Sequence, residues 1–353
     1  MNNYRNILIV RTDRMGDVVL TTPAIKALKL GWPEAKLSIL VTPATRDLIV
    51  GNPYLDEILV DDRGGTHRGP IGFARLVALL RRKKFDLAII YHTKKRTNLA
   101  CFLAGIPRRT GYRNNKFGFL LTDPILDERH RGRKHESQYC LDVLRHLGVP
   151  ADKILDKSPE ALLEDIYVAV TPQARNWADQ FCQDNRISEH NRPIAIHPGA
   201  SDPAKQWPSE QFAELIDRLS GRYSSPIIII GAGHASEAVL EILPRVKVPV
   251  INLTDKTTVG QMAALLQRCR ILVSNDSGPV HVAAGVGIPV ISIFTRDQPG
   301  INPERWQPLG KFSRVVCVSP SSATAASLTG AKSPEAIPTQ AVLEAVDAIF
   351  KLC

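Results

Sequence analysis

The amino-acid sequence predicts an α/β protein made of two doubly wound, Rossmann-like domains that face each other across a cleft. Two observations carry this prediction. Short apolar, β-branched segments alternate with longer amphipathic segments, and this alternation stops near residue 123 and restarts near residue 193. The chain has 353 residues, which is the length of two ordinary domains. We therefore expect two parallel sheets built from βαβ units, with ligands bound at the carboxyl ends of their strands.

The individual elements follow from the period of the apolar residues. Strands are expected in the first half at 6–10, 36–41, 57–60, 86–91 and 109–111, and helices at 17–30, 44–51, 73–83 and 98–104. Residues 123–192 show no clear strand and are expected to form a connector with helices at 136–147 and 172–185. In the second half we expect strands at 193–197, 226–231, 250–253, 271–274 and 290–294, and helices at 209–220, 235–243, 259–268 and 279–285.

These elements give an N-terminal domain at 1–170 and a C-terminal domain at 171–337. A last amphipathic helix is expected within 338–353, where it could pack back toward the N-terminal domain. The segment 319–336 is rich in Ser, Ala, Thr and Pro and is expected to be a surface loop.

The composition is that of a globular protein, with 44% hydrophobic and 23% charged residues, and it excludes a disordered chain. No apolar run approaches the roughly 18–20 residues that a membrane helix needs, and the N-terminus lacks the apolar core of a signal peptide. The six cysteines are scattered, without zinc-site spacing. We therefore expect a cytoplasmic protein with reduced thiols and no metal site.

The excess positive charge lies entirely in the first half of the chain. The net charge is +10, yet residues 1–150 hold 26 Lys and Arg against 14 Asp and Glu, a net of +12. Basic clusters occur at 81–84, 94–96, 108–109 and 129–134. Such a field attracts an anionic partner, which could be a nucleic acid, an anionic lipid or a phosphorylated substrate.

The segment RTDRMGD at 11–17 follows the first expected strand and opens the next helix. A dinucleotide-binding domain would carry GxGxxG here, and its absence disfavours a nicotinamide or flavin enzyme. Asp17 fits two roles, the N-cap of the helix or a general base at the carboxyl end of the strand. The positive end of the helix is expected to keep this carboxylate ionised and so to make it a weaker base.

The segment IHPGASDPAKQWP at 196–208 occupies the same place after the first strand of the second half. Its small residues, including Gly199 and Ser201, leave backbone amides suited to binding an anion. Lys205 is the only cation of this loop and could neutralise a diphosphate leaving group. The structural alternative is a solvated Lys205 beside a Trp207-Pro208 pair that seats the next helix.

Two further loops of the second half connect a strand to a helix. SNDSGPVH at 274–281 places Pro279 near the first helical position, so the free amides of that helix could bind a phosphate. The alternative is simply a well-capped helix, with His281 as a structural residue. GAGHASE at 231–237 could hold a nucleoside, with Glu237 either bonded to a ribose hydroxyl or placed at the positive end of a helix.

At these loops the chain resembles glycosyltransferase family 9, the ADP-heptose:lipopolysaccharide heptosyltransferases. The resemblance rests on ILIVRTDRMGDVVLTTPAIKALK, IAIHPGASDPAKQWPSEQFAELI and VSNDSGPVHVAAGVGIPVISIF, together with the helix KHESQYCLDVLRHLG. It covers nearly the whole chain and implies a GT-B fold and an inverting, metal-independent transfer without a cofactor.

The resemblance also assigns residues. It makes Asp17 the catalytic base and Lys205 the diphosphate contact, with ADP-heptose as donor and the anionic lipopolysaccharide core as acceptor. The expected donor-binding residues are Gly199, Ser201, Glu237, Asp276, Ser277, Gly278 and His281. The expected acceptor-binding residues are Arg11, Asp13, Arg14, Arg63, Arg113 and His135. Contact with the cytoplasmic face of the inner membrane is a further expectation.

Three alternatives remain open at this point. The chain could be a GT-B transferase with another nucleotide-sugar donor or acceptor, or a nucleotide-sugar epimerase, which would not need the basic first half. It could also be a non-enzymatic protein that binds a nucleotide or a polyanion. Nucleic acid is the least favoured partner, because aromatic residues make up only 6% of the chain and are not interleaved with the basic clusters.

Overall fold

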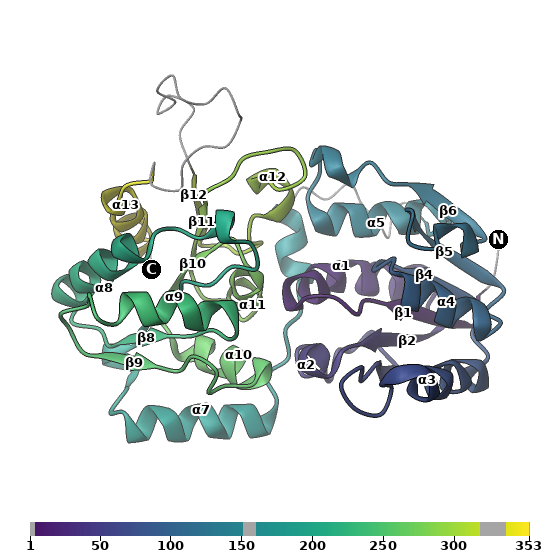
Figure 1. Ribbon diagram of the computed structural model, residues 1–353, viewed down its shortest axis with the longest axis horizontal. Helices are drawn as coiled ribbons and strands as arrows, with labels where there is room; N and C mark the ends of the chain where they lie inside the picture. Colours follow the sequence, from purple (N-terminus) through teal and green to yellow (C-terminus); the bar gives the residue numbers. More distant parts are fainter. Residues whose placement is uncertain (1–3, 151–159, 318–336, 353) are drawn as a thin grey trace. The chain divides into compact units, whose positions relative to one another are not determined.

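The computed structural model describes residues 4–150, 160–317 and 337–352. The chain divides into two compact units, Met1–Ala169 and Val170–Cys353, next to the boundary expected from the sequence. Each unit contains one six-stranded sheet in which all neighbouring strands are parallel (Figure 1). The expected surface loop at 319–336 lies outside the described residues.

The sheet of the first unit has the order β3-β2-β1-β4-β5-β6. Its strands are β1 (Asn6–Val10), β2 (Lys36–Val41), β3 (Glu57–Val60), β4 (Leu87–Ile90), β5 (Arg108–Arg113) and β6 (Asp123–Leu126). Its helices are α1 (Met15–Gly31), α2 (Pro43–Arg46), α3 (Gly69–Lys83), α4 (Lys95–Leu103) and α5 (Glu136–His146). The order reverses between β1 and β4, so the crevice at their carboxyl ends is where a doubly wound sheet binds ligands.

The sheet of the second unit has the order β12-β11-β10-β7-β8-β9, which reverses between β7 and β10. Its strands are β7 (Ile194–His197), β8 (Ile227–Ile229), β9 (Val250–Asn252), β10 (Ile271–Asn275), β11 (Val290–Phe294) and β12 (Ser313–Cys317). Its helices are α7 (Pro172–Asp184), α8 (Ser209–Tyr223), α9 (His234–Ile242), α10 (Val259–Arg268), α11 (Gly278–Gly285), α12 (Pro303–Trp306) and α13 (Thr339–Phe350).

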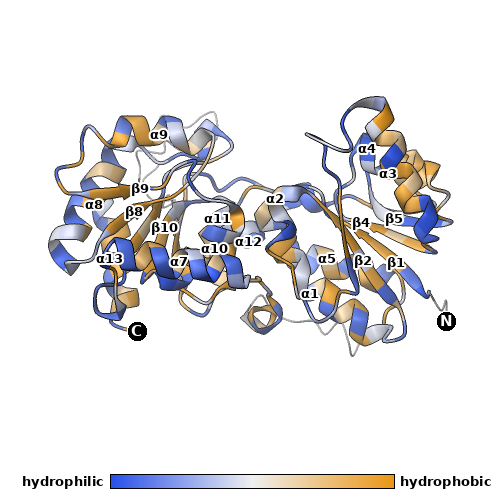
Figure 2. Ribbon diagram, turned by 90° about the horizontal axis from the view of Figure 1, so that it is seen from below, coloured by the Kyte–Doolittle hydropathy of each residue, from blue (hydrophilic) through white to orange (hydrophobic). Residues whose placement is uncertain are grey.

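The central strands are buried on both faces, which explains their continuous runs of Ile, Leu and Val. Ile7 of β1 lies between Leu37 of β2 and Leu87 of β4 in register, and all three side chains are fully buried. Figure 2 shows the hydrophobic strands of each sheet, with hydrophilic residues on the outer faces of the helices. This sandwich of helices around a parallel sheet confirms the α/β fold predicted for each half.

Three expectations about the elements are wrong. β6 lies in the segment expected to lack strands, and β12 was not expected at all. Both are edge strands with partly exposed side chains, and therefore neither has the apolar run of a central strand. The helix expected at 44–51 ends early, at Arg46.

The last helix, α13, belongs to the core of the second unit. Its buried residues Val342, Val346 and Ile349 are in one cluster with Phe212 of α8 and Ile291 of β11. Its apolar face is therefore used within the second unit, and the expected packing toward the N-terminal domain stays a prediction.

Candidate active site

The loop after β1 contains a buried arginine that holds three carboxylates. The Arg11 side chain is 1% exposed, and its Nη2 lies 2.7 Å from Asp17 Oδ1 and 3.1 Å from Glu136 Oε1. Its Nε lies 3.4 Å from Asp13 Oδ1. Asp13 and Asp17 come from the loop and the first turn of α1, whereas Glu136 opens α5. We name Arg11, Asp13, Asp17 and Glu136 the acidic cluster.

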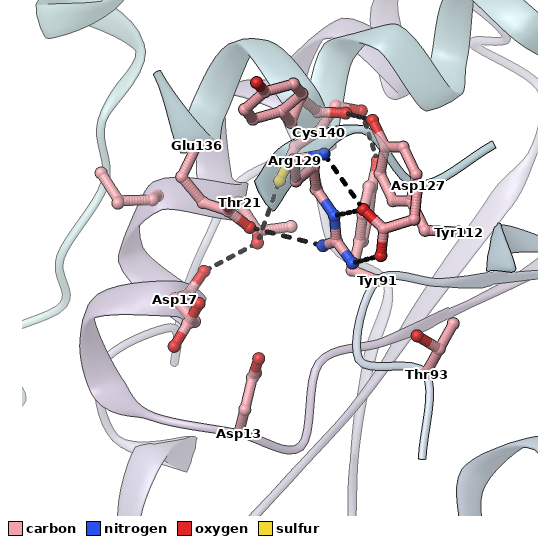
Figure 3. Close-up of polar contacts among 12 residues, drawn as sticks. Asp13, Asp17, Thr21, Tyr91, Thr93, Tyr112, Asp127, Arg129, Glu136 and Cys140 are labelled. Carbon is pink, nitrogen blue, oxygen red and sulfur yellow. Dashed lines mark hydrogen bonds and ion pairs between the residues drawn. The ribbon is translucent and has the colours of Figure 1, made fainter. Parts of the chain in front are cut away.

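A second arginine, Arg129, also contacts Glu136. Arg129 binds Asp127 through Nε and Nη2, at 2.9 and 2.8 Å, and its guanidinium lies 4.1 Å from the centre of the Tyr112 ring. Its Nη1 is 3.9 Å from Glu136 Oε1, the oxygen that Arg11 also contacts, so two guanidinium groups act on this buried carboxylate. Such sharing fixes Glu136 and limits how much of the charge of Arg11 is available to Asp17. Figure 3 shows Arg129 beside Glu136 and Asp127.

The acidic cluster raises the basicity of Asp17. Burial raises the pKa of Asp17 to about 7; Arg11 opposes this effect, while the negative charges of Asp13 and Glu136 add to it. Burial likewise raises the pKa of Asp13. The expectation that the helix end keeps Asp17 ionised considered only the helix dipole, whereas desolvation and the neighbouring carboxylates act in the opposite direction.

The helix begins two residues before Asp17, at Met15, with Arg14 in the N-cap position. Asp17 is thus in the first turn and is not the N-cap, so its carboxylate is directed to Arg11 instead of to the backbone. In Figure 3 Asp13 and Asp17 lie side by side, one on the loop and one on the helix. Asp13 and Asp17, the two candidates for the catalytic base, therefore both lie next to Arg11.

The predicted acceptor-binding residues fall into two groups. Arg14, Arg63 and Arg113 are exposed, and Arg63 also binds Asp61 and Thr12. Arg11 and His135, in contrast, are buried, at 1% exposure each.

The two buried residues have structural partners, and their assignment as acceptor contacts stays a prediction. His135 is the N-cap of α5, where Nδ1 accepts a hydrogen bond from the Ser137 amide at 3.3 Å. Arg11 can act on an acceptor only through the carboxylates that it holds. From the sequence, the contact between Arg11 and Glu136 was not visible, because it depends on the packing of α5 against α1.

The second unit brings two predicted residues together at its own switch point. Lys205 follows β7, Asp276 follows β10, and Lys205 Nζ forms an ion pair with Asp276 Oδ2. The Lys205 side chain is 18% exposed, so it is neither a solvated surface lysine nor fully enclosed. Its loop is fixed by Asp202, which accepts a hydrogen bond from the Ala204 amide and pairs with Arg296 at 2.8 Å.

Asn275 joins these two loops. Its amide nitrogen donates to the Pro198 carbonyl at 2.6 Å, and its carbonyl oxygen accepts from the Trp207 amide at 3.0 Å. Trp207 itself is buried in the core, as the structural alternative for the Trp207-Pro208 pair predicted. Asn275 therefore sets the position of Lys205, although no sequence motif drew attention to it.

The start of α11 leaves its backbone amides without a side-chain cap. Ser277 occupies the N-cap position, but its hydroxyl lies 3.1 Å from His197 Nδ1 and makes no capping bond. Burial lowers the pKa of His197 to about 4, so this imidazole is neutral at pH 7. The amide at Gly278 can therefore serve an anion, as expected for the phosphate-binding end of a helix.

The other predicted donor-binding residues differ in position. His281 is buried within α11, whereas Ser201 and Glu237 are exposed. Gly199 packs against the start of α9, where a Cβ atom would lie 2.6 Å from Ala235 Cβ. This close approach gives Gly199 a packing role that the sequence did not show. Within the described ranges, no three His, Cys, Asp or Glu side chains are grouped to hold a metal ion.

Comparison with known proteins agrees with this arrangement. Residues 73–329 match the family "Glycosyltransferase family 9 (heptosyltransferase)". Lipopolysaccharide heptosyltransferase 2 of Escherichia coli K12 is 26% identical over 318 residues, covering 88% of this chain and 87% of that protein.

Two solved structures share the fold. A family 9 glycosyl transferase from Veillonella parvula DSM 2008 superposes with a TM-score of 0.84 at 24% identity, over 99% of this chain and 98% of the other. E. coli ADP-heptose lps heptosyltransferase II gives 0.73 at 24% identity, over 98% and 99%. The predicted GT-B class is thus confirmed. Because the family match spans well over half of the sequence, the chain belongs to glycosyltransferase family 9, the heptosyltransferase family.

Proposed function

We propose that this glycosyltransferase moves heptose from ADP-heptose to the inner core of lipopolysaccharide, with inversion and without a metal ion. The observation that carries the proposal is the partly buried Asp17 carboxylate, which pairs with Arg11 at the carboxyl end of β1 and whose pKa is raised to about 7. A base for a sugar hydroxyl works best when its pKa lies near the working pH. The names of the similar proteins support heptose and ADP-heptose as the sugar and its donor.

In the proposed reaction Asp17 accepts the proton of an acceptor hydroxyl. The hydroxyl oxygen attacks the anomeric carbon of the donor from the face opposite the diphosphate. The bond from this carbon to the diphosphate oxygen breaks in the same step, and ADP leaves with the electron pair. One displacement inverts the anomeric centre, and the proton remains on Asp17 until it passes to solvent.

The negative charge that develops on ADP needs a partner in the second unit. We assign this role to Lys205 and to the first amides of α11, at Ser277 and Gly278. In the free protein Lys205 is held by Asp276, so a diphosphate must share or replace this partner. The pair keeps the lysine in place before the donor binds, which reduces the ordering that binding requires.

The acceptor half of the reaction uses the basic first unit. Exposed arginines at positions 14, 63 and 113 carry charge that suits the carboxylates and phosphates of a lipopolysaccharide core. Transfer requires Asp17 and Lys205 to act on one donor–acceptor pair. We place the reaction in the cytoplasm, at the surface of the inner membrane.

The decisive assay incubates the protein with ADP-heptose and heptose-deficient lipopolysaccharide and follows the acceptor mass. We expect one added heptose, complete loss of transfer in Asp17→Ala, and nearly unchanged ADP binding of that variant by calorimetry. Asp47→Ala, a change of an exposed aspartate that follows α2, is the matched control and should retain full activity. Retained turnover in Asp17→Ala would move the base elsewhere, with Asp13 next. Transfer from UDP- or GDP-sugars but not from ADP-heptose would refute the donor, and epimerised donor would refute the reaction class.

A further inference from the structure

The charge of the protein is concentrated in one stretch of the first unit. Residues 81–122 contain eleven Lys and Arg and a single acidic residue, Asp86. This stretch includes the end of α3, all of α4 and the short helix η1 (Gly118–Leu120). Asp86 accepts hydrogen bonds from backbone amides at Arg5 and Asn6 and therefore does not neutralise the basic side chains nearby.

Lys83, Arg96 and Arg108 pair with the carboxylates of Glu57, Asp61 and Asp123, which lie outside this stretch. The remaining basic side chains still give an excess of positive charge, which attracts anions over a distance of about 10 Å at ordinary salt.

Apolar side chains protrude from the same surface. Phe119 of η1 is 72% exposed, and Phe102 and Leu103 at the end of α4 are 45% and 39% exposed. α4 packs against both η1 and α3, and the two longer helices lie side by side in Figures 1 and 2. Exposed apolar side chains within a basic surface suit insertion among the headgroups of a lipid bilayer.

Cations and aromatic rings alternate across this patch. Arg109 lies 5.5 Å from the centre of the Phe102 ring and donates a hydrogen bond to the Leu120 carbonyl, which connects α4 with η1. Lys95 lies 5.7 Å from the Phe117 ring, which in turn contacts Phe119.

A hydrogen bond joins α3 to the end of α4, because Arg81 Nη2 donates to the Leu103 carbonyl at 2.6 Å. Exposed apolar side chains surrounded by Lys and Arg are typical of proteins that bind in the headgroup region of an anionic bilayer. We name Arg81, Lys95, Phe102, Leu103, Arg109 and Phe119 the α4 patch.

One edge of the α4 patch leads toward the acidic cluster. Asn114 donates to Thr93, and Asn98 donates to the Lys116 carbonyl, so the loops after β4 and β5 are held together. This contact brings the Lys94 and Lys116 side chains next to each other, and Lys94 is also within electrostatic reach of Asp13. A lipid-anchored anion bound at this edge would therefore lie close to the residues proposed to react.

We propose that the α4 patch docks the protein on an anionic lipid bilayer, with Phe119 and Phe102 inserted among the headgroups and the basic side chains bound to lipid phosphates. In the described part of the chain no helix is long and apolar enough to cross a bilayer. The inference deepens the proposed function, because it specifies how an acceptor that is part of a membrane is reached. It does not depend on the identity of the donor.

The test measures binding of the full chain to sedimented vesicles, with no donor or acceptor present. We expect binding to vesicles of phosphatidylglycerol and phosphatidylethanolamine, little binding to phosphatidylcholine, and loss of binding at high salt. The variants F102S/F119S and R81E/K95E should each weaken binding at least tenfold. L240S on α9 and R175E on α7 change equally exposed residues of the second unit and should bind as the wild type does.

The outcomes separate this inference from the proposed reaction. All six changed residues are on the surface, so thermal unfolding should be unchanged, and transfer to a detergent-solubilised acceptor should be retained in F102S/F119S. Transfer to vesicle-embedded acceptor should fall through a higher KM. Equal binding of the patch variants and the wild type, equal binding to neutral vesicles, or binding to oligonucleotides or acidic peptides but not to vesicles would overturn the proposal.

Discussion

Glu136→Gln tests how the buried charges set the basicity of Asp17. The substitution keeps the size of the side chain but removes one negative charge from the acidic cluster. Arg11 then has fewer carboxylates to share its charge with, and the repulsion between Glu136 and Asp17 disappears. Both effects stabilise the ionised form of Asp17, so its pKa should fall.

The geometry gives the size of this fall. One Arg11 nitrogen lies 2.7 Å from Asp17 and 3.1 Å from Glu136, so the two carboxylates are within about 6 Å of each other. At an effective dielectric constant of about 20, two charges at this distance repel by about 2.8 kcal/mol, or about two pH units. Some solvent reaches Asp17, which is 16% exposed, and we therefore expect a fall of about one to two pH units.

The assay is the pH dependence of kcat/KM for heptose transfer. The acid limb of the wild-type profile should lie near pH 7, because Asp17 must be ionised to accept a proton. In Glu136→Gln this limb should move to lower pH and the plateau rate should fall, since the base is weaker. Ionisations of the substrates are common to both proteins and cancel in the difference.

Glu128→Gln is the matched control, because Glu128 is exposed and pairs with Arg131 outside the acidic cluster. Its profile should coincide with that of the wild type. An acid limb that stays in place in Glu136→Gln, or that moves to higher pH, would refute the role given to these charges.

Three further predictions concern the role of Lys205, the pH dependence of stability and the absence of a metal requirement. Lys205→Ala should weaken ADP binding, measured by calorimetry, at least tenfold and should also lower turnover. Lys247→Ala, an exposed control, should change neither quantity. Unchanged turnover in Lys205→Ala would remove Lys205 from the site. Because the pKa of Asp17 is about 7 in the folded state and about 4 when unfolded, the contribution of Asp17 to the free energy of unfolding should fall as pH rises from about 4 to 7, by up to about 1.4 kcal/mol per pH unit. The lowered pKa values of His92 and His197 act in the opposite direction, so this contribution is read from the difference between a variant and the wild type. Asp17→Asn has no ionisable group at this position. In urea titrations its free energy of unfolding relative to that of the wild type should therefore be higher at pH 8 than at pH 5. The same difference in free energy of unfolding at both pH values would contradict the raised pKa of Asp17. A chelator such as EDTA should leave the transfer rate unchanged, and loss of activity that Mg²⁺ or Mn²⁺ restores would contradict the metal-independent proposal.

The sequence predicted most of the fold because the central strands are buried on both faces. Such strands need unbroken apolar runs, and the runs at β1, β2 and β11 gave their bounds correctly. Edge strands have no such requirement. β6 begins with Asp123 and Pro124 and alternates between partly buried and exposed residues, so its pattern resembles that of a loop.

The site was predicted in part, for a different reason. Loops that follow the strands on either side of a switch point must come together, and in the structure Lys205 and Asp276, from two such loops, form an ion pair. The contacts between α1 and α5 obey no such rule. Glu136 is 125 residues from Arg11 in sequence, and only packing shows that it shares this arginine with Asp17. The raised pKa of Asp17 was missed for the same reason, because local sequence suggests only the effect of the helix end.

The most direct test of the central claim is the titration of the Asp17 carboxyl carbon itself. Protein labelled with ¹³C at the aspartate carboxyl groups can be followed by NMR from pH 4 to 9, and the Asp17 signal identified by its absence in Asp17→Asn. Our account predicts a midpoint near pH 7, as burial and the neighbouring carboxylates require. A midpoint below pH 5 would show a carboxylate that is fully ionised in the cell and would contradict the account.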